Sequence, residues 1–450
     1  MLESRQEFIA TKGKQKKQIK CDADSIAGCV SQRACVYSGA RVVLNPVTDA
    51  VHLVHGPIGC ASYTWDIRGS LSSGSELYRN SFCTDLKEQD VIFGGGKKLA
   101  SAIDELAAKY HPPVVFVYST CIVGVIGDDL EAICRAAAIR HGIEVLPVQS
   151  SGFIGNKAAG YRAACDTLLR LIEPAQPVWA KKPGSINYLG DFNLAGEAWI
   201  IEQYLREIGI DINVVITGDS TYEKLKTAPE ASLNIMQCAG SMNYLASKME
   251  EIYGIPYIRI SFLGMEDTAA SLRQIAAGLG DETAAKKAEQ LISREIANTQ
   301  PLIDRYREKF AGKKAAIYVG GGFKAISLIK QFREIGIEVV MVGTQNGRQE
   351  EYDTINDLVD DGTIILDDAN PAELERFMLD KGAHLLVGGV KERPLAYKLG
   401  IAFIDHNHDR KHPLSGYAGA VNFAQEVNST LCSPVWDTIR KGGHSEWLKK

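Results

Sequence analysis

Three cysteines are placed where thiolates could hold a metal cluster. Cys60 lies in HGPIGCASYTWDIR, just after the strand-like run Val51–Val54, while Cys35 and Cys121 lie in RACVYSGAR and YSTCIVGVIGDD. Glycines near each cysteine allow tight turns, so we expect Cys60 on a glycine-bounded loop that fixes its sulfur. Iron–sulfur clusters need such fixed thiolates and nearby backbone N–H donors. A second interpretation stays open, because a cysteine in apolar surroundings is commonly a small core residue.

These cysteines are far apart in the sequence, so they form one site only if the fold assembles it. Each stands at an expected strand end, and ligand sites in open α/β sheets form at the carboxyl ends of strands. Three thiolates leave a four-ligand cluster incomplete. The set therefore points to a further ligand from a partner chain.

Two further regions could bind a ligand. Cys238, in NIMQCAGSMN, stands at a predicted strand-to-helix junction, where a helix N-terminus favours a thiolate, although a buried small residue fits the same pattern. The segment DHNHDRKHP carries three histidines after a predicted strand, and His406 is nearest to the strand end. It is either a ligand site or a polar surface loop. Lys391, in GGVKERP, adds charge suited to an anionic ligand, unless it is only an exposed loop charge.

The elements that must position these residues alternate between strands and helices, as in parallel, doubly wound α/β sheets. Before residue 180 the predicted strands are Arg41–Leu44, Val51–Val54, Pro113–Tyr118 and Glu144–Val148. The proline-rich stretch PAQPVWAKKP marks a domain boundary. We predict an N-terminal arm over 1–20, followed by α/β domains over 21–180, 181–300 (with Cys238) and 301–450 (with the His406 loop).

Composition narrows the possible partners and location. The chain has 450 residues, of which 45% are hydrophobic, and a net charge of −5, so nothing in its charge favours nucleic acid or an anionic membrane. Its first twenty residues are polar and basic, unlike a secretory signal, and the ten cysteines of such a chain are expected as thiols or metal ligands. We expect a cytoplasmic protein.

Long segments resemble one known family. VHLVHGPIGCASYTWDIRG, STCIVGVIGDDLEAIC, NYLGDFNLAGE, CAGSMNYLASKMEEIYGIPY, SFLGMEDTAASLR, GGVKERPLAYKLGI and SGYAGAVNFAQEV are similar to the α-type subunits of the nitrogenase component 1 superfamily. The resemblance covers essentially the whole chain. It implies three Rossmann-like domains with parallel doubly wound sheets, a heterotetramer with a related β-type subunit, and electrons from a separate ATP-dependent iron protein.

The resemblance also assigns metal sites. Cys35, Cys60 and Cys121 match the ligands of an iron–sulfur cluster at the subunit interface, either an eight-iron P-cluster or a four-iron 4Fe-4S cluster completed by the partner. Cys238 matches the thiolate at one end of a large 8Fe-9S-C type cluster, here expected in a precursor form whose heterometal is open. His406 falls where the catalytic subunit has its second cofactor ligand.

Other positions bear on the chemistry. The resemblance places Lys391 near the organic acid of the cofactor, Ser241 among its binding residues, and Arg68 and Tyr161 at the substrate face of the cluster. Tyr161 stands in place of a histidine. Gly240 and Phe323 stand where the dinitrogen-reducing enzyme has arginines, which argues against dinitrogen reduction.

Three functions remain open at this stage. We expect a nitrogenase-like reductase of the methylthio-alkane reductase kind, which cleaves carbon–sulfur bonds, with His406 as a catalytic ligand. The alternative is a scaffold of the NifE type, which holds a precursor of the nitrogenase iron-molybdenum cofactor and then releases it. A third possibility is an electron-relay or assembly subunit with an empty Cys238 site.

Overall fold

The computed structural model describes residues 3–14, 18–21, 33–65, 80–173, 180–406, 410 and 412–436. The chain forms two compact units, which are considered separately. One comprises Ala34–Ile260 and Arg273–Lys287, and the other comprises Met1–Arg33, Ser261–Leu272 and Ala288–Lys450.

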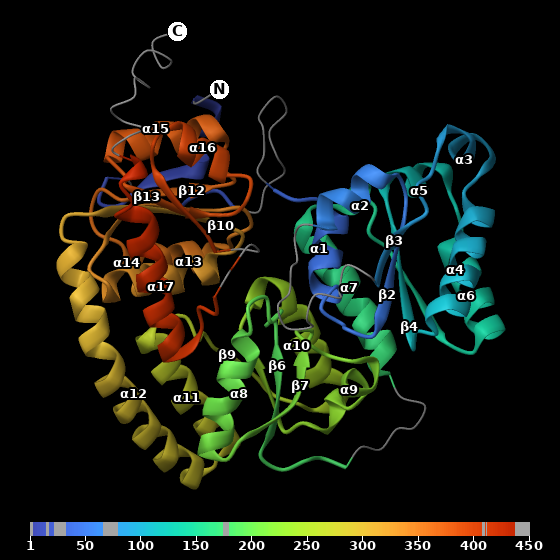
Figure 1. The fold of residues 1–450 in the computed structure, drawn as a ribbon, viewed down its shortest axis with the longest axis horizontal. Coiled ribbons are helices and arrows are strands. Elements are labelled where there is room, and N and C mark those ends of the chain that lie inside the picture. The colour runs from blue at the N-terminus through green and yellow to red at the C-terminus, as the bar shows by residue number, and fades with distance from the viewer. Residues whose placement is uncertain are drawn as a thin grey trace. The chain divides into compact units, whose positions relative to one another are not determined.

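The first unit contains two parallel sheets. The first sheet has the order β3 (Ser81–Cys83), β2 (Ala50–His55), β4 (Val114–Ser119) and β5 (Glu144–Val148). Helices α4 (Gly96–Tyr110) and α6 (Leu130–His141) lie on one face, and α1 (Val36–Leu44) and α7 (Lys157–Ile172) lie on the other (Figure 1). Every residue of β2 and β4 is buried, as expected for strands covered by helices on both faces.

The second sheet of this unit is also parallel. Its order is β7 (Asp211–Ile216), β6 (Ser185–Leu189), β8 (Leu233–Met236) and β9 (Tyr257–Arg259). The helices that follow its first three strands in sequence are α8 (Glu197–Ile208), α9 (Tyr222–Lys226) and α10 (Ala239–Tyr253). Both sheets share one hydrophobic core, in which Leu168 of α7 and Met242 of α10 are fully buried.

The other unit contains a six-stranded sheet. Its order is β1 (Ile9–Thr11), β12 (Ile364–Asp367), β11 (Glu338–Thr344), β10 (Lys314–Val319), β13 (Leu385–Gly388) and β14 (Ala402–Asp405). Helices α13 (Gly322–Glu334) and α14 (Gln349–Leu358) cover one face, and α15 (Pro371–Lys381) and α16 (Arg393–Lys398) cover the other (Figure 1). The remaining long helices are α11 (Met265–Leu279), α12 (Glu282–Lys309) and α17 (Gly416–Leu431).

The predicted α/β class with parallel sheets is confirmed, and two local predictions are wrong. The described part of the expected arm over 1–20 is not separate, because β1 pairs antiparallel with β12 and the buried Arg5 side chain bonds Glu373 Oε1 at 3.0 Å. Arg41–Leu44 belongs to helix α1 rather than to a strand. Its short apolar run fits a buried helix as well as a buried strand. The domain limits at 180 and 300 stay a prediction.

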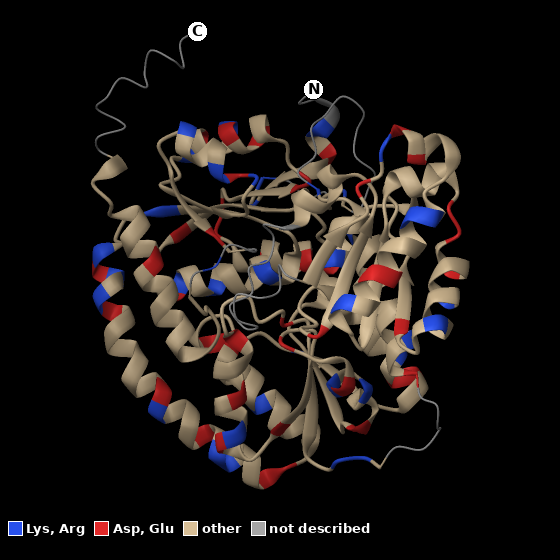
Figure 2. Ribbon diagram, turned by 45° about the vertical axis from the view of Figure 1, so that its right-hand side comes forward, with Lys and Arg blue, Asp and Glu red and all other residues tan. Residues whose placement is uncertain are grey.

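The helices carry both basic and acidic side chains. Basic and acidic side chains are interspersed along α12, a pattern typical of a solvated helix (Figure 2). Among the described residues, no helix is both long enough and apolar enough to cross a bilayer.

Helices α1 and α7 approach each other closely at two glycines. A Cβ on Gly160 would lie 1.9 Å from the carbonyl oxygen of Val36, and a Cβ on Gly39 would lie 2.2 Å from that of Lys157. Both obstacles are backbone atoms, which cannot rotate away. The crossing therefore requires glycine at both positions.

We predict that Gly160→Ala destabilises the protein by about 2 to 3 kcal/mol, because the added methyl forces α1 and α7 apart. Chemical denaturation followed by circular dichroism measures this loss. Gly240→Ala in α10 is the matched control, since a methyl group at that position would meet nothing within 4 Å. Equal stability of the two variants would contradict the close crossing.

Candidate functional site

The carboxyl edge of the first sheet brings cysteines together. Cys83 is the last residue of β3, Cys60 follows β2, and Cys121 follows β4. These three strands are neighbours in the order β3, β2, β4, with Val54 opposite Cys83 and His55 opposite Ser119. Cys35 precedes α1 as its N-cap residue.

Each of the predicted cluster cysteines lies at the start of a helix. Cys60 is in the first turn of α2 (Ile58–Trp65), not on a loop as the sequence suggested, because Gly56–Pro57 already complete the turn out of β2. Cys121 opens α5 (Cys121–Ile126). First-turn N–H groups have no partner within the helix, so they present positive charge to a thiolate.

The pKa of Cys60 depends on the neighbouring thiols. Burial raises the pKa of Cys60, and Cys35, Cys121 and Cys83 raise it further. Such coupling requires the four thiols to share one neighbourhood. Cys35 and Cys121 are exposed, whereas Cys60 and Cys83 are half-buried.

The donor set suits an iron–sulfur cluster. The Gly152 N–H donates to Cys121 Sγ at 3.3 Å, and a side chain on Gly152 would come within 2.8 Å of that sulfur. Within the described ranges, no three potential ligands are close enough to hold a single metal ion. A cluster several ångströms across needs thiolates farther apart than one ion does, so sulfur-only ligands with N–H donors fit a cluster better.

A buried histidine braces the turn that leads to Cys60. His55 Nε2 lies 3.0 Å from Asp128 Oδ2, and its Nδ1 lies 3.0 Å from Thr84 Oγ1. Both Asp128 oxygens also accept the Gly95 N–H at 3.1 Å. Burial lowers the pKa of His55, and the Asp128 carboxylate only partly opposes this shift.

Cys238 forms a second candidate site in the same unit. It is the N-cap residue of α10, as the sequence predicted for a strand-to-helix junction. Gly190, with a φ of +80°, packs against it, since a side chain there would lie 2.8 Å from Cys238 Cβ. Burial raises the pKa of Tyr161, and Cys238 raises it further, so the tyrosine lies near this thiol. Ser241 is buried, and its hydroxyl donates to the Cys238 carbonyl at 3.3 Å.

Two further residues were named by the resemblance. Arg68 lies outside the described residues. At Gly240 an added Cβ would meet nothing within 4 Å.

His406 lies in the other unit, directly after β14. It is fully buried, and neither ring nitrogen has a hydrogen-bond partner among the described residues. Burial, followed by the charges of Lys324 and Arg410, lowers its pKa well below the ordinary value, so the imidazole is neutral. A buried imidazole with uncommitted nitrogens suits a metal ligand. Cys238 belongs to the first unit.

The structure also shows the contacts of His406, Lys391 and Phe323. Lys324 Nζ donates to the His406 carbonyl at 3.1 Å, a contact that the sequence did not indicate. Lys391 is exposed, and its Nζ donates to the Arg33 carbonyl at 3.2 Å. The Phe323 N–H donates to Glu351 Oε1 at 3.0 Å.

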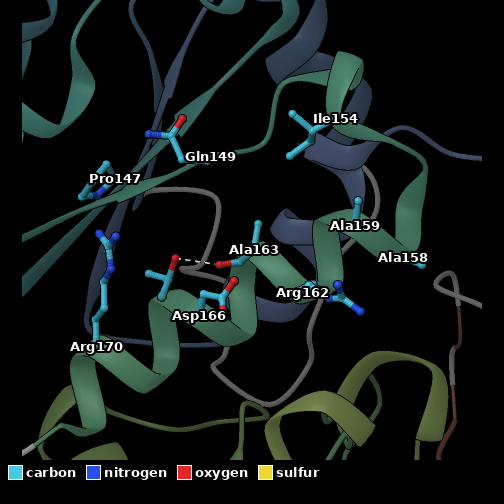
Figure 3. Close-up of a pocket in the computed structure, with 10 residues that line it drawn as sticks. Pro147, Gln149, Ile154, Ala158, Ala159, Arg162, Ala163, Asp166 and Arg170 are labelled. Atoms are coloured by element: carbon cyan, nitrogen blue, oxygen red, sulfur yellow. Dashed lines mark hydrogen bonds between the residues drawn. The ribbon is translucent and has the colours of Figure 1, made fainter. Parts of the chain in front are cut away.

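A groove of about 510 Å³ runs over α7 in the first unit (Figure 3). Arg162, Asp166 and Arg170 project from successive turns of the helix. Asp166 accepts the Tyr244 hydroxyl at 2.7 Å, and Arg170 pairs with Glu131 at 3.1 Å. No cysteine lines the groove, so it is not the cluster site.

Comparison with known proteins is consistent with this sulfur-based site. Residues 35–432 match the family described as nitrogenase component 1 type oxidoreductase. The chain belongs to this family.

Several family relatives carry one name. The chain is 63% identical over 420 residues to the nitrogenase iron-molybdenum cofactor biosynthesis protein NifE of Clostridium pasteurianum, covering 93% of this chain and 92% of that one. It is 55% identical to NifE of Methanosarcina barkeri, over 98% and 97% of the two chains. The solved structure "Nitrogenase Cp1 at pH 5" superposes with a TM-score of 0.87 at 32% identity, over 97% and 96%.

These comparisons decide between some of the earlier expectations. The superfamily and its three-sheet fold are confirmed. The main functional prediction, a catalytic reductase, is not supported, because the relatives are named as cofactor biosynthesis proteins. The roles of the individual site residues stay predictions.

We predict that Asp128→Asn weakens the brace around His55 and costs about 1 to 3 kcal/mol at pH 7, because a buried hydrogen-bond partner is lost. The variant should also lose stability more steeply below pH 6.5. Its His55 pKa falls further without the carboxylate, while the unfolded state still takes up a proton near 6.5, so acid favours unfolding.

Denaturation at pH 7 and pH 5.5 measures both effects. The control is Glu131→Gln, which breaks only the exposed pair with Arg170 and should cost less than about 1 kcal/mol. An Asp128→Asn variant with the control's stability at both pH values would show that the brace is unimportant.

Proposed function

We propose that this chain is a scaffold subunit for the assembly of the nitrogenase iron-molybdenum cofactor. The observation that carries the proposal is the 63% identity to NifE of Clostridium pasteurianum over nearly the full length of both chains. At this identity the fold and its buried side chains are largely shared. The same name recurs in relatives down to 36% identity.

In this proposal Cys35, Cys60 and Cys121 hold an iron–sulfur cluster at the edge of the first sheet. Their electrical coupling and their helix-start positions support a common ligand. A four-iron cluster takes four thiolates, so the three are completed by a ligand from a partner. Whether the cluster has four or eight irons follows from the number of partner thiolates.

The partner is a β-type subunit of the same superfamily, in a heterotetramer. Exposed apolar side chains surround the exposed cysteines: Phe93 of α3 (Glu88–Phe93) is 85% exposed, Val125 of α5 is 70% exposed, and Phe153 is 71% exposed. The elements α3, α5 and the turn Gly152–Ile154 contact each other in succession. A patch of this kind beside thiols that need shielding from water fits a protein interface.

The large cofactor precursor is the cargo, and Cys238 holds it. It is the N-cap residue of α10, and Tyr161 and Ser241 lie at the same junction. The resemblance assigns His406 as a second ligand and Lys391 to the organic acid, and the uncommitted nitrogens of His406 suit that assignment. Glycine at position 240 leaves less positive charge near Cys238 than an arginine would, which suits a cargo that must leave.

Electrons for maturation would come from an ATP-dependent iron protein, as the resemblance implies. The decisive experiment purifies the chain with its β-type partner under anaerobic conditions and mixes it with cofactor-free nitrogenase component 1. Restored acetylene reduction, without turnover of acetylene or organic sulfides by this protein alone, supports the scaffold. Turnover by this protein itself would instead support a reductase.

We predict that Cys238→Ala abolishes transfer of the cargo and removes the iron of the large cluster, while leaving the interface cluster in place. Iron content and electron paramagnetic resonance measure the two clusters separately. Cys134→Ala is the control, because Cys134 is a core thiol of α6 on the opposite face of the first sheet. Full iron content and transfer in Cys238→Ala would refute this site.

We predict that Phe93→Asp weakens association with the β-type subunit at least tenfold, because the apolar patch loses a large side chain and gains a charge that must be desolvated. Analytical ultracentrifugation measures the dissociation constant. Ile139→Asp changes an equally exposed apolar residue, 81% exposed on α6, and should leave association unchanged. Equal weakening by both variants would argue against an interface at α3.

A further inference from the structure

The first sheet presents one thiol more than the sequence indicated. We propose that Cys83 is a fourth ligand of this chain to the iron–sulfur cluster, so that the free chain holds a complete four-iron cluster before its partner binds. This inference rests on the proposed interface cluster at Cys35, Cys60 and Cys121.

The strand order places Cys83 at the same edge as two of those ligands. β2 has β3 on one side and β4 on the other, all parallel, so their carboxyl ends coincide. Cys83 ends β3, Cys60 follows β2, and Cys121 follows β4. In an open α/β sheet, ligands bind at the carboxyl ends of the strands, so three adjacent strand ends can contribute residues to one site.

The surroundings of Cys83 and Cys60 coincide. Both side chains are half-buried against the same hydrophobic cluster. Tyr37 belongs to that cluster and is itself buried.

Cys83 Sγ makes two hydrogen bonds, one as acceptor and one as donor. The Asp85 N–H donates to the sulfur at 3.3 Å, the kind of contact that stabilises cluster thiolates. The thiol hydrogen is directed to the Gly56 carbonyl at 3.3 Å.

The ligation step is a simple exchange. The Cys83 thiol would lose its proton to water, and its sulfur would bond the fourth iron in place of a bound water, which would leave to solvent, so that no oxidation state changes. The Gly56 carbonyl loses its thiol donor, while the Asp85 N–H bond can remain. Four thiolates then satisfy a cubane cluster, and the partner's ligand replaces Cys83 when the interface forms.

Other cysteines of this unit lack these features. Burial raises the pKa of both Cys134 and Cys165 to about 12, and both are packed among core side chains on helices α6 and α7. They remain neutral core residues. Cys134 therefore serves as a matched control for a change at Cys83.

The test reconstitutes the full chain, without its partner, using ferrous iron and sulfide under anaerobic conditions. We expect about four irons per chain for the unchanged protein and at least a twofold loss for Cys83→Ala. Cys134→Ala should retain the full content. Melting curves establish that each variant is folded, and the complex with the β-type partner should keep its interface cluster in Cys83→Ala.

A second measurement needs no variant. Maleimide labelling followed by peptide mass spectrometry should show Cys83 protected in the loaded chain and modified after the iron is chelated. Unchanged iron content in Cys83→Ala, or equal labelling before and after chelation, would overturn the proposal and leave the three-cysteine site intact. Unchanged iron content in Cys60→Ala would instead overturn the interface cluster itself.

Discussion

The parallel pairing of β2 with both β3 and β4 is the constraint on which the candidate site depends. It brings three strand ends to one edge, and the chain must leave each end through a tight turn. Helices α2 and α5 then begin at once, so Cys60 and Cys121 both lie in the first turn of a helix. Burial of every β2 and β4 residue fixes the register. The positions of the thiols follow from this register.

Much of the fold could be predicted from the sequence. The runs Val51–Val54 and Glu144–Val148 are strands because continuous apolar residues in an alternating α/β chain must be buried on both faces. Arg41–Leu44 was mistaken for a strand, because four apolar and basic residues carry no clear periodicity. The sequence does not predict the short edge strand β1, because it has only three residues and lies in a polar segment.

The site was predictable in part, and the limit has a physical cause. The sequence predicts Cys238 at a strand-to-helix junction, and the structure has it there, but it predicts Cys60 on a loop and Cys35 at a strand end, whereas both lie at helix starts. Cys83 gives no such signal, because its strand has only three residues and its importance comes from the neighbouring strand. The Lys324 contact with the His406 backbone likewise joins segments distant in sequence.

The close crossing of α1 and α7 has a consequence for electron flow. Cys35 caps α1, Gly39 and Gly160 bring the two backbones together, and the next residue, Tyr161, lies beside Cys238. Electron tunnelling weakens much less through packed covalent segments than across empty space. The glycine pair thus joins the segments that carry the two proposed metal sites through directly packed backbone, the kind of path along which tunnelling would be weakened least.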